Sequence, residues 1–527
     1  MKKIKILYYN WVDFEDEEER GGGVSIYQRN LVDAATRQGD EVWFLSSGVS
    51  YSPFSSRPFI REVKARKEGV RKFEVVNSTL FSPGHEAFGV EVADSPAMDT
   101  AFADFLREHG PFDVIHFNNL EGIPVSFLRL AREHYPQAKV IYSVHNYFAF
   151  CPQVNLWFQE KATCQDFRAG RKCVNCLMKP ANPRGTRRLY RMEYCLRKLG
   201  VRPQSALYRL AAWLVYGPVR TLYRLAKTVA RGDTVLAEVL PDQRRGSREA
   251  TKPTAILDPN EAAQFARRRQ RFVDALNTYT DHILAVSQRV AELAIGFGID
   301  ASKVQTLYIG TRFAPSAIRH PPSAIRQTDN QTADGGLRIA YLGYMRRDKG
   351  FYFYLDALQK MPAQLARRLG LVFAVKMGDP FAYDRIKRMA HRFASVTFYD
   401  GYTHAQLPQI LSGVDLGIVP VLWEDNLPQV AIECVASGVP ILTSNRGGAK
   451  ELLNCPDLVF RAGSRADFYA KLQAVLEKPA ILSTALAGRA RLYSLEDHYQ
   501  CLRGGFYRDT PQTNPATAGK NLWVTAI

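Results

Sequence analysis

Two parts of the chain alternate short apolar runs with amphipathic helical patterns, and this alternation restricts the fold more than any other feature. In the first part, strands are indicated at 4–10, 41–46, 113–117 and 139–145, and helices such as 24–38 and 98–109 lie between them. In the second part, strands are indicated at 338–343, 370–377, 395–399, 416–420 and 440–444. Short apolar runs separated by helices are typical of parallel sheets covered on both faces. The sequence therefore predicts two doubly wound α/β domains.

A polar segment separates the two parts. Residues 311–336 are rich in Pro, Ser, Asn, Gln and Asp, and they repeat Pro-Ser-Ala-Ile-Arg, which favours a flexible linker. A chain of 527 residues is also too long for one ordinary hydrophobic core. The predicted organisation is an N-terminal domain over 1–177 that includes a cysteine cluster at 151–176, a basic and mainly helical insertion over 178–280, a return to the N-terminal domain over 281–310, the linker over 311–336, a C-terminal domain over 337–490, a C-terminal helix over 491–508 and a tail over 509–527.

The formal charge of +18 is concentrated in the insertion. Residues 178–280 hold 21 Lys or Arg and only 8 Asp or Glu. A helix over 204–231, kinked at Pro218, would place basic residues near one face, namely Arg209, Arg220, Arg224, Lys227 and Arg231. Two interpretations stay open: an interfacial surface that approaches anionic lipid head groups, or a helical hairpin whose basic side is only solvated.

The same charge superficially suits a nucleic-acid-binding protein, as does Arg267-Arg268-Arg269. The charge sits in one insertion, however, and no RNA-binding or helix-turn-helix signature is present, so we expect no nucleic-acid partner. No window of about 18 uncharged apolar residues is present, and the first residues indicate a strand instead of a signal peptide. We expect a cytoplasmic protein, at most peripheral at the inner face of the membrane.

Glycines and cations stand where the predicted strands end. Gly21-Gly22-Gly23 follows the first strand and precedes a helix, where free amides can approach a ligand. In the second part, Gly343 ends a strand, and the loop to the next helix holds Arg346, Arg347 and Lys349. Cations at a strand-to-helix turn suit a diphosphate leaving group.

Further along, two acidic residues flank the start of another helix. Pro428 fits the first turn of this helix, with Asn426 or Leu427 at its N-cap, so the helix would begin at the strand ends where ligands bind. Glu433 lies about one and a half turns along the helix and could accept hydrogen bonds from sugar hydroxyls.

These residues resemble the pattern of the retaining glycosyltransferases of family 4, which have the GT-B fold of two facing Rossmann-like domains. The matching residues are Gly343 with Lys349-Gly350, Asp425 with Glu433, Ser437-Gly438-Val439-Pro440, Gly447-Gly448 with Glu451, the glycine run at 21–23 and His145. The resemblance implies an α/β, GT-B fold with a largely helical basic insertion. It covers most of the chain except the insertion, the linker and the tail.

The resemblance also implies roles for single residues. Glu433 would bind the ribose of the nucleotide and Lys349 its pyrophosphate, Asp425 would bind the donor sugar, and His145 would lie beside the reacting sugar. Together with these, the expected donor-binding residues are Gly22, Gly23, Gly343, Arg346, Arg347, Asn426 and Leu427. The sequence departs from the family at two positions. Asp425 stands where the family usually has Glu, unless Glu424 takes that role, and Tyr344 stands where the family has a basic residue.

The activity implied is retaining transfer, without a catalytic metal, from a UDP- or GDP-sugar to a saccharide or lipid-linked saccharide, as in cell-surface polysaccharide biosynthesis. Two alternatives stay open besides the nucleic-acid-binding protein. A nucleotide-sugar epimerase of the same fold would need no second substrate, and a noncatalytic descendant would bind nucleotide without turnover.

Four of the eight cysteines lie close together directly after His145. They are Cys151, Cys164, Cys173 and Cys176. One Cys-x-x-Cys and two further cysteines could form a tetrahedral structural zinc site, although free buried thiols or a redox pair are equally open readings.

Overall fold

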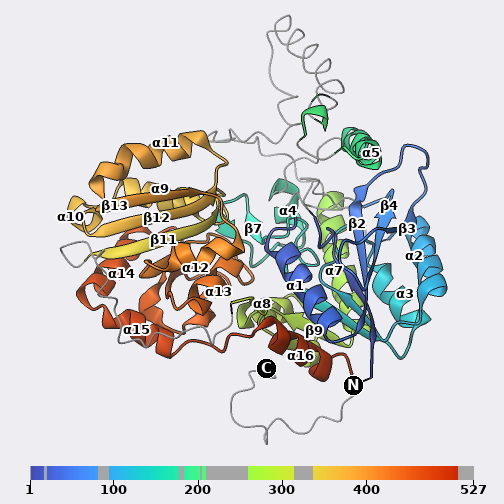
Figure 1. The fold of residues 1–527 in the computed structure, drawn as a ribbon. Helices are drawn as coiled ribbons and strands as arrows, with labels where there is room; N and C mark the ends of the chain where they lie inside the picture. The colour runs from blue at the N-terminus through green and yellow to red at the C-terminus, as the bar shows by residue number, and fades with distance from the viewer. Residues whose placement is uncertain are drawn as a thin grey trace, which may run out of the picture.

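The computed structural model describes residues 2–16, 20–80, 94–176, 183–201, 205–208, 210, 259–313 and 336–508. Most of the expected arginine face of 204–231, most of the linker and the tail lie outside the described residues. Two α/β lobes lie side by side, with the N-terminal one coloured blue to green and the C-terminal one yellow to orange (Figure 1). The predicted pair of doubly wound domains is confirmed.

The N-terminal domain is built on an eight-stranded sheet with the order β10-β9-β6-β5-β1-β2-β4-β3. Only β3, which pairs with β4, is antiparallel to its neighbour. The strands are β1 Lys5–Tyr9, β2 Glu41–Ser50, β3 Phe59–Val63, β4 Val70–Val76, β5 Val114–Phe117, β6 Lys139–Val144, β9 His282–Ala285 and β10 Val304–Thr306. The covering helices are α1 Gly23–Arg37, α2 Pro96–His109, α3 Ser126–His134, α7 Pro259–Tyr279 and α8 Gln288–Gly296.

The segment after the predicted insertion joins this domain. Strands β9 and β10 extend its sheet beyond β6, and α7 packs against α3. The end of the predicted insertion is therefore a covering helix of the first domain.

The C-terminal domain has a six-stranded sheet with the order β13-β12-β11-β14-β15-β16, and its paired strands are parallel. The strands are β11 Leu337–Tyr344, β12 Leu369–Lys376, β13 Ser395–Asp400, β14 Leu416–Val419, β15 Ile441–Ser444 and β16 Val459–Phe460. The helices are α9 Phe351–Gln359, α10 Ala363–Ala366, α11 Pro380–Met389, α12 Leu407–Leu411, α13 Gln429–Ala436, α14 Arg465–Glu477 and α15 Ala480–Ala487. The central strands are almost wholly buried because helices cover both faces, which explains their continuous apolar runs.

Smaller elements lie at the edge of the first domain. A hairpin of β7 Trp157–Phe158 and β8 Ala162–Thr163 is followed by α4 Arg171–Cys176, which contacts α7. Helix α5, Pro183–Lys198, contacts β2, and its Tyr194 hydroxyl accepts a hydrogen bond from Arg61 at 2.9 Å. Among the described helices, none is long and apolar enough to cross a membrane.

The last helix returns from the second domain to the first. Helix α16, Leu495–Gly505, runs below the N-terminal domain in Figure 1. Its Arg503 forms an ion pair of 2.6 Å with Asp40, and both side chains are buried. The Tyr499 hydroxyl donates to the same carboxylate at 2.5 Å, and the backbone N–H of Ile4 donates to it at 3.1 Å. Asp40 thus joins α16 to the start of the first sheet.

Replacing Asp40 with Ala is expected to destabilise the fold by about 3–5 kcal/mol, because the Arg503 cation would remain buried without its carboxylate. Urea unfolding followed by circular dichroism measures this change. The matched control is Glu496→Ala on the same helix, whose partner Arg37 is half-exposed, as is Glu496 itself. This variant should lose less than about 1 kcal/mol. Equal losses in the two variants would show that the buried pair does not hold the helix.

Candidate functional site

The loop between β11 and α9 carries the predicted phosphate-binding cations. Gly343, the penultimate residue of β11, has a φ angle of 126°. Gly350, the N-cap residue of α9, has a φ angle of 76°. A Cβ atom at Gly350 would lie 1.7 Å from the carbonyl oxygen of Pro420, so glycine alone allows the loop to pack there. The loop is thereby held at the carboxyl ends of β11 and β14, where open α/β sheets bind ligands.

Lys349 of this loop contacts Asp425. Its Nζ donates to Oδ2 at 2.6 Å, and the Asp425 side chain is 8% exposed whereas that of Lys349 is 29% exposed. Nζ also lies 5.3 Å from the ring centre of Trp423. Two predicted site residues, distant in sequence, are therefore neighbours. An accessible ammonium beside a carboxylate suits a ligand that carries both phosphates and hydroxyls.

The two arginines of the same loop form ion pairs of their own. Arg346 pairs with Asp348 at 2.7 Å, and Arg347 pairs with Glu160 of the β7–β8 hairpin at 3.5 Å. Both arginine side chains are more than half exposed. The Arg347 pair is exposed and therefore weak, so its guanidinium group can turn towards an anionic ligand. Arg346 instead holds the buried Asp348 through two hydrogen bonds, at 2.9 and 2.7 Å.

The start of α13 differs from the prediction. Pro428 occupies the N-cap position, so the expectation of Asn426 or Leu427 at the cap is wrong. The Asn426 side chain instead donates to the carbonyl of Val144 in the first domain at 3.1 Å, and the backbone carbonyl of Asn426 accepts from the Ser287 hydroxyl at 2.8 Å. Leu427 is buried. These contacts fix the residues before the helix, so the helix begins later than the local sequence indicates.

Glu433 lies on the buried side of α13, with 2% of its side chain exposed. His404 Nε2 lies 2.9 Å from its Oε1, and the histidine ring stacks near Phe313 at 6.4 Å between centroids. Sequence reasoning missed His404. It belongs to a loop without a recognisable motif, and only the fold brings it beside α13.

The first domain presents its glycines and His145 to the same region. Gly22, with φ 54°, caps α1, and a Cβ atom on Gly23 would lie 3.9 Å from Cβ of Gln429 in α13. The starts of α1 and α13 therefore face each other across the two domains. Both helix ends favour negative charge.

His145 follows β6, directly after the Val144 carbonyl that Asn426 contacts. Its ring lies 4.4 Å from that of Tyr27, and its Nε2 is buried without a hydrogen-bond partner. Burial, helped by the nearby His498, lowers the pKa of His145 to about 3. The imidazole is therefore neutral at physiological pH and has an unused nitrogen for a ligand.

Glu424, the alternative to Asp425, is engaged elsewhere. Its carboxylate pairs with Arg289 of the first domain at 3.1 Å, and it accepts from Arg446 at 3.4 Å and from the N–H of Gly447 at 3.1 Å. Burial acts to raise the pKa of Glu424, but Arg289 outweighs burial and the pKa is lowered. Of the two acids, Asp425 contacts Lys349 and Glu424 joins the domains.

The Gly-Gly segment and Glu451 complete this junction. A Cβ atom at Gly447 would lie 2.0 Å from the carbonyl oxygen of Asp425, and one at Gly448 would lie 2.6 Å from Ser287 of the first domain. Glu451 accepts from the N–H groups of Gln288 and Arg289 at 2.8 Å each. Its carboxylate thus binds the N-terminus of α8 in the other domain.

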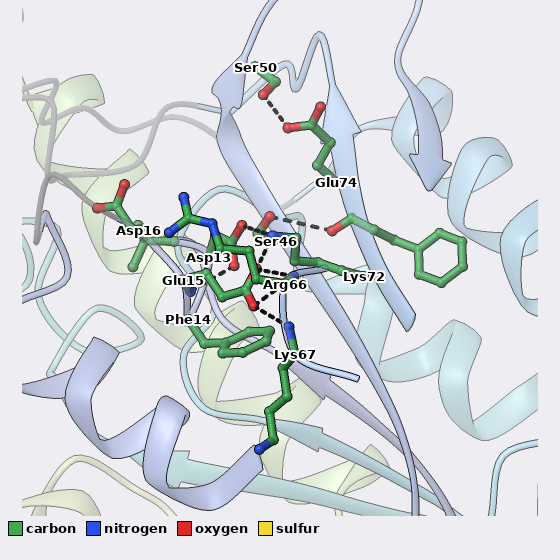
Figure 2. A network of polar contacts seen from close by, with 12 residues as sticks. Asp13, Phe14, Glu15, Asp16, Ser46, Ser50, Arg66, Lys67, Lys72 and Glu74 are labelled. Carbon is green, nitrogen blue, oxygen red and sulfur yellow. Dashed lines mark hydrogen bonds and ion pairs between the residues drawn. The ribbon is translucent and has the colours of Figure 1, made fainter. Parts of the chain in front are cut away.

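The loop before the glycine run is held by charges. Figure 2 shows Lys72 of β4 beside the carboxylates of Asp13 and Glu15, at 2.8 and 2.6 Å. Glu15 also accepts from the backbone N–H groups of Arg66 and Lys67. Burial acts to lower the pKa of Lys72, but Asp13 and Glu15 outweigh burial and raise it. A buried cation therefore anchors the segment after β1.

The four clustered cysteines line one small cavity together with Gln153, Trp157, Phe158, Lys172 and Arg269. None of the four forms a disulfide within the described part of the chain, and Cys173 is buried. Burial, and secondly the nearby Cys151, raises the pKa of Cys173 to about 12. Within the described part of the chain, no three His, Cys, Asp or Glu side chains already have a metal-holding arrangement. The zinc site therefore stays a prediction.

Comparison with known proteins gives the second domain its family. Residues 336–478 match the family described as glycosyl transferases group 1. This segment is a group 1 glycosyltransferase domain. It contains the predicted donor-side residues Lys349, Asp425 and Glu433, whereas His145 and the glycine run lie in the other domain.

Curated relatives of this chain include spore coat protein SA of Bacillus subtilis (strain 168), which is 24% identical over 181 residues, or 32% of this chain and 48% of that protein. A glycogen synthase of Mycobacterium tuberculosis (strain CDC 1551 / Oshkosh) is 28% identical over 166 residues, or 30% of this chain and 39% of that protein. The matched regions therefore span about half or less of these curated relatives.

The solved structure of Anabaena Alr3699/HepE in complex with UDP has a TM-score of 0.51 and 14% sequence identity, and the match covers 95% of this chain and 99% of that chain. A likeness at this identity concerns the fold alone. Two facing Rossmann-like domains, one of them a group 1 domain, confirm the predicted GT-B fold.

Replacing Glu424 with Gln is expected to destabilise the protein by about 1.5–3 kcal/mol at pH 7, because the part-buried hydrogen bonds of Arg289 lose their charged acceptor. Because the pKa of Glu424 is lowered in the folded state, this stabilisation is present above the ordinary glutamate pKa of about 4.3. It disappears as the pH falls through the lowered value. Thermal unfolding at several pH values measures the difference.

The matched control is Glu292→Gln, which removes the exposed partner of the same arginine. It should change the stability by less than about 1 kcal/mol. A difference between Glu424→Gln and the unmodified protein that stays constant down to pH 3 would contradict the ion-pair assignment.

Proposed function

We propose that the protein is a retaining glycosyltransferase that uses a nucleotide-sugar donor without a catalytic divalent metal. The Lys349–Asp425 contact at the start of α13, which faces Gly23 of the first domain, supports this proposal most directly. A cation, a carboxylate and two facing helix ends suit a ligand with a diphosphate at one end and a sugar at the other.

Each residue has a proposed role in donor binding. Lys349, assisted by Arg346 and Arg347, binds the diphosphate and neutralises the charge that develops as the sugar leaves. Glu433 accepts hydrogen bonds from the ribose hydroxyls. Asp425 accepts hydrogen bonds from the donor sugar.

The bond changes in the proposed reaction occur on one face of the sugar. The acceptor oxygen forms a bond to the anomeric carbon while the bond from that carbon to the phosphate oxygen breaks. The acceptor proton passes to the departing phosphate oxygen. Because the new bond forms on the face from which the phosphate leaves, the anomeric configuration is retained. Neutral His145 contributes hydrogen bonding beside the reacting sugar and does not need to carry a charge.

UDP is the first nucleotide to test, because the Anabaena protein of similar fold was solved with UDP. GDP is the second. An epimerase of the same fold would convert a nucleotide sugar without any acceptor, and a noncatalytic relative would bind nucleotide without turnover. Transfer to an added acceptor separates the proposed function from both.

The acceptor side of the proposal concerns α5 and the residues after it. Arg188 and Lys198 are exposed on α5, and nearby Leu199, Leu207 and Leu210 are 78%, 57% and 52% exposed. Exposed leucines among basic side chains suit the interface of an anionic membrane. We propose peripheral attachment at the inner membrane face, a lipid-linked saccharide acceptor and a role in cell-surface polysaccharide synthesis.

Thermal stabilisation by nucleotides tests the donor site. One of UDP, GDP, ADP or CMP, or its sugar conjugate, should raise the unfolding temperature. At a ligand concentration of a hundred times Kd, the free energy of unfolding should rise by about 2.7 kcal/mol. The double variant Lys349→Ala, Glu433→Ala should lose this shift, whereas Lys360→Ala, an exposed lysine at the end of α9, should keep it.

The product then tests the reaction. Its new glycosidic bond should keep the anomeric configuration of the donor, as read by proton NMR, without added Mg²⁺ or Mn²⁺. An inverted product, or stabilisation by none of the nucleotides, would refute the proposed function.

Co-sedimentation with vesicles tests the membrane proposal. The double variant Arg188→Gln, Lys198→Gln should bind phosphatidylserine-rich vesicles about 30-fold more weakly, since each basic residue contributes about 1 kcal/mol near an anionic surface. The control Lys387→Gln, Arg388→Gln removes two exposed charges from α11 and should bind normally. Equal binding of both variants, or no binding by the unmodified protein, would exclude α5 as the attachment surface.

A further inference from the structure

The cysteine cavity lies at the edge of the first domain, between the two lobes. Cys151 follows the loop after β6, Cys164 follows the β7–β8 hairpin, and Cys173 and Cys176 lie on α4. All four side chains line the same cavity. Three segments that are separate in the sequence therefore deliver four sulfur atoms to one place.

Two arginines of α7 lie beside this cavity without a carboxylate partner among the described residues. Arg268 is 4% exposed, and its guanidinium carbon lies 4.6 Å from the ring centres of both Phe148 and Phe272. One of its N–H groups donates to the carbonyl of Phe148 at 2.8 Å, but its Nε and Nη1 are buried without a partner. Arg269 lines the cavity itself and donates to the carbonyl of Phe150 at 2.8 Å.

A buried cation without a counter-ion is costly, and buried charges are normally paired. The four thiols can become anions, and they share the cavity with Arg269. Four thiolates around one divalent ion carry a net charge of −2. The two arginines carry +2, which offsets this charge, and Lys172 at the same cavity supplies a further cation.

The backbone of this segment is unusually strained. Among the described residues, eight that are not glycine have positive φ, and six of them lie here, namely Val154, Leu156, Gln159, Glu160, Arg168 and Ala169. Such conformations cost about 1–3 kcal/mol each and persist where the surroundings hold them. The hairpin has only two residues in each strand, so its own hydrogen bonds provide little support.

We propose that Cys151, Cys164, Cys173 and Cys176 bind one Zn²⁺ ion as four thiolates, with Arg268 and Arg269 as counter-charges. Binding releases the four thiol protons to solvent, and the sulfur atoms become the tetrahedral ligands. The sulfur atoms line the cavity but do not yet have the separations of a metal site. Rotation of the cysteine side chains into the cavity brings them together.

The site fixes the hairpin next to the donor loop. Glu160 at the hairpin turn pairs with Arg347 of the loop after β11, and β7 lies between the two lobes in Figure 1. Zinc therefore holds a first-domain element against the second domain. This positioning role rests on the proposed function, whereas the metal site itself does not.

Metal analysis of the full chain, purified without chelators, tests the site independently of activity. Elemental analysis by inductively coupled plasma mass spectrometry should find about one zinc ion per chain. Replacement by Co²⁺ should give the thiolate-to-metal charge-transfer absorption and the visible bands of tetrahedral cobalt. Cys173→Ser should lose the metal, and Cys501→Ser, a half-buried cysteine of α16, should keep it.

The arginines provide a second test that leaves the ligands intact. Arg268→Met should weaken zinc binding about 10–100-fold in a competition with a chromogenic chelator, as loss of a supporting group around a metal does. Arg268→Lys should restore part of the affinity. The control Arg271→Met removes an exposed arginine of the same helix that pairs with Asp94, and it should bind zinc normally.

Three results would overturn the proposal: a chain with no bound metal, an iron-containing chromophore, or disulfides between these cysteines in a chain purified under reducing conditions. Each is visible in the unmodified protein, so misfolding of a variant cannot hide it. A protein that binds zinc but transfers no sugar would refute the proposed function and leave the zinc site standing.

Discussion

The carboxylate of Glu451 at the N-terminus of α8 is the contact on which the arrangement of the two domains depends. It accepts two backbone N–H groups of the first domain at 2.8 Å, and the Tyr308 hydroxyl donates to it at the same distance. Burial raises the pKa of Glu451, because it disfavours the ionised carboxylate. The surrounding hydrogen-bond donors stabilise the ionised form. Beside it, Glu424 binds Arg289. Two acids of the second domain thus hold one helix of the first.

This junction places the site residues opposite one another. The same short segment that holds Glu424 continues through Asp425 and Asn426 into α13, so fixing Glu424 also fixes the acid that contacts Lys349. Asn426 joins the segment to the carbonyl of Val144, next to His145. The site between the domains therefore follows from contacts made one or two residues away from the groups assigned to the ligand.

The sequence predicted the central strands of both sheets because buried parallel strands are continuous apolar runs. The resemblance to the family singled out Lys349, Asp425 and Glu433; the structure brings Lys349 and Asp425 into contact, and the roles of all three stay predictions. It could not predict the cap of α13, since Asn426 is diverted by a carbonyl in the other domain. Nor could it separate Glu424 from Asp425 or find His404. Those distinctions depend on which distant side chain each residue meets, and no local pattern records that.

The charged residues show most clearly what the sequence alone could not predict. From the sequence, Arg268 and Arg269 were expected to belong to a basic insertion whose surface faces an anionic partner. The structure places Arg268 against two phenylalanine rings, where it is buried, and Arg269 at a cavity lined by cysteines. A buried guanidinium cannot contribute to a surface field, and it needs an anion inside the protein. Part of the charge of this chain therefore concerns an internal site, and the described basic residues that remain exposed include Arg188 and Lys198 of α5 and Arg267 and Arg271 of α7.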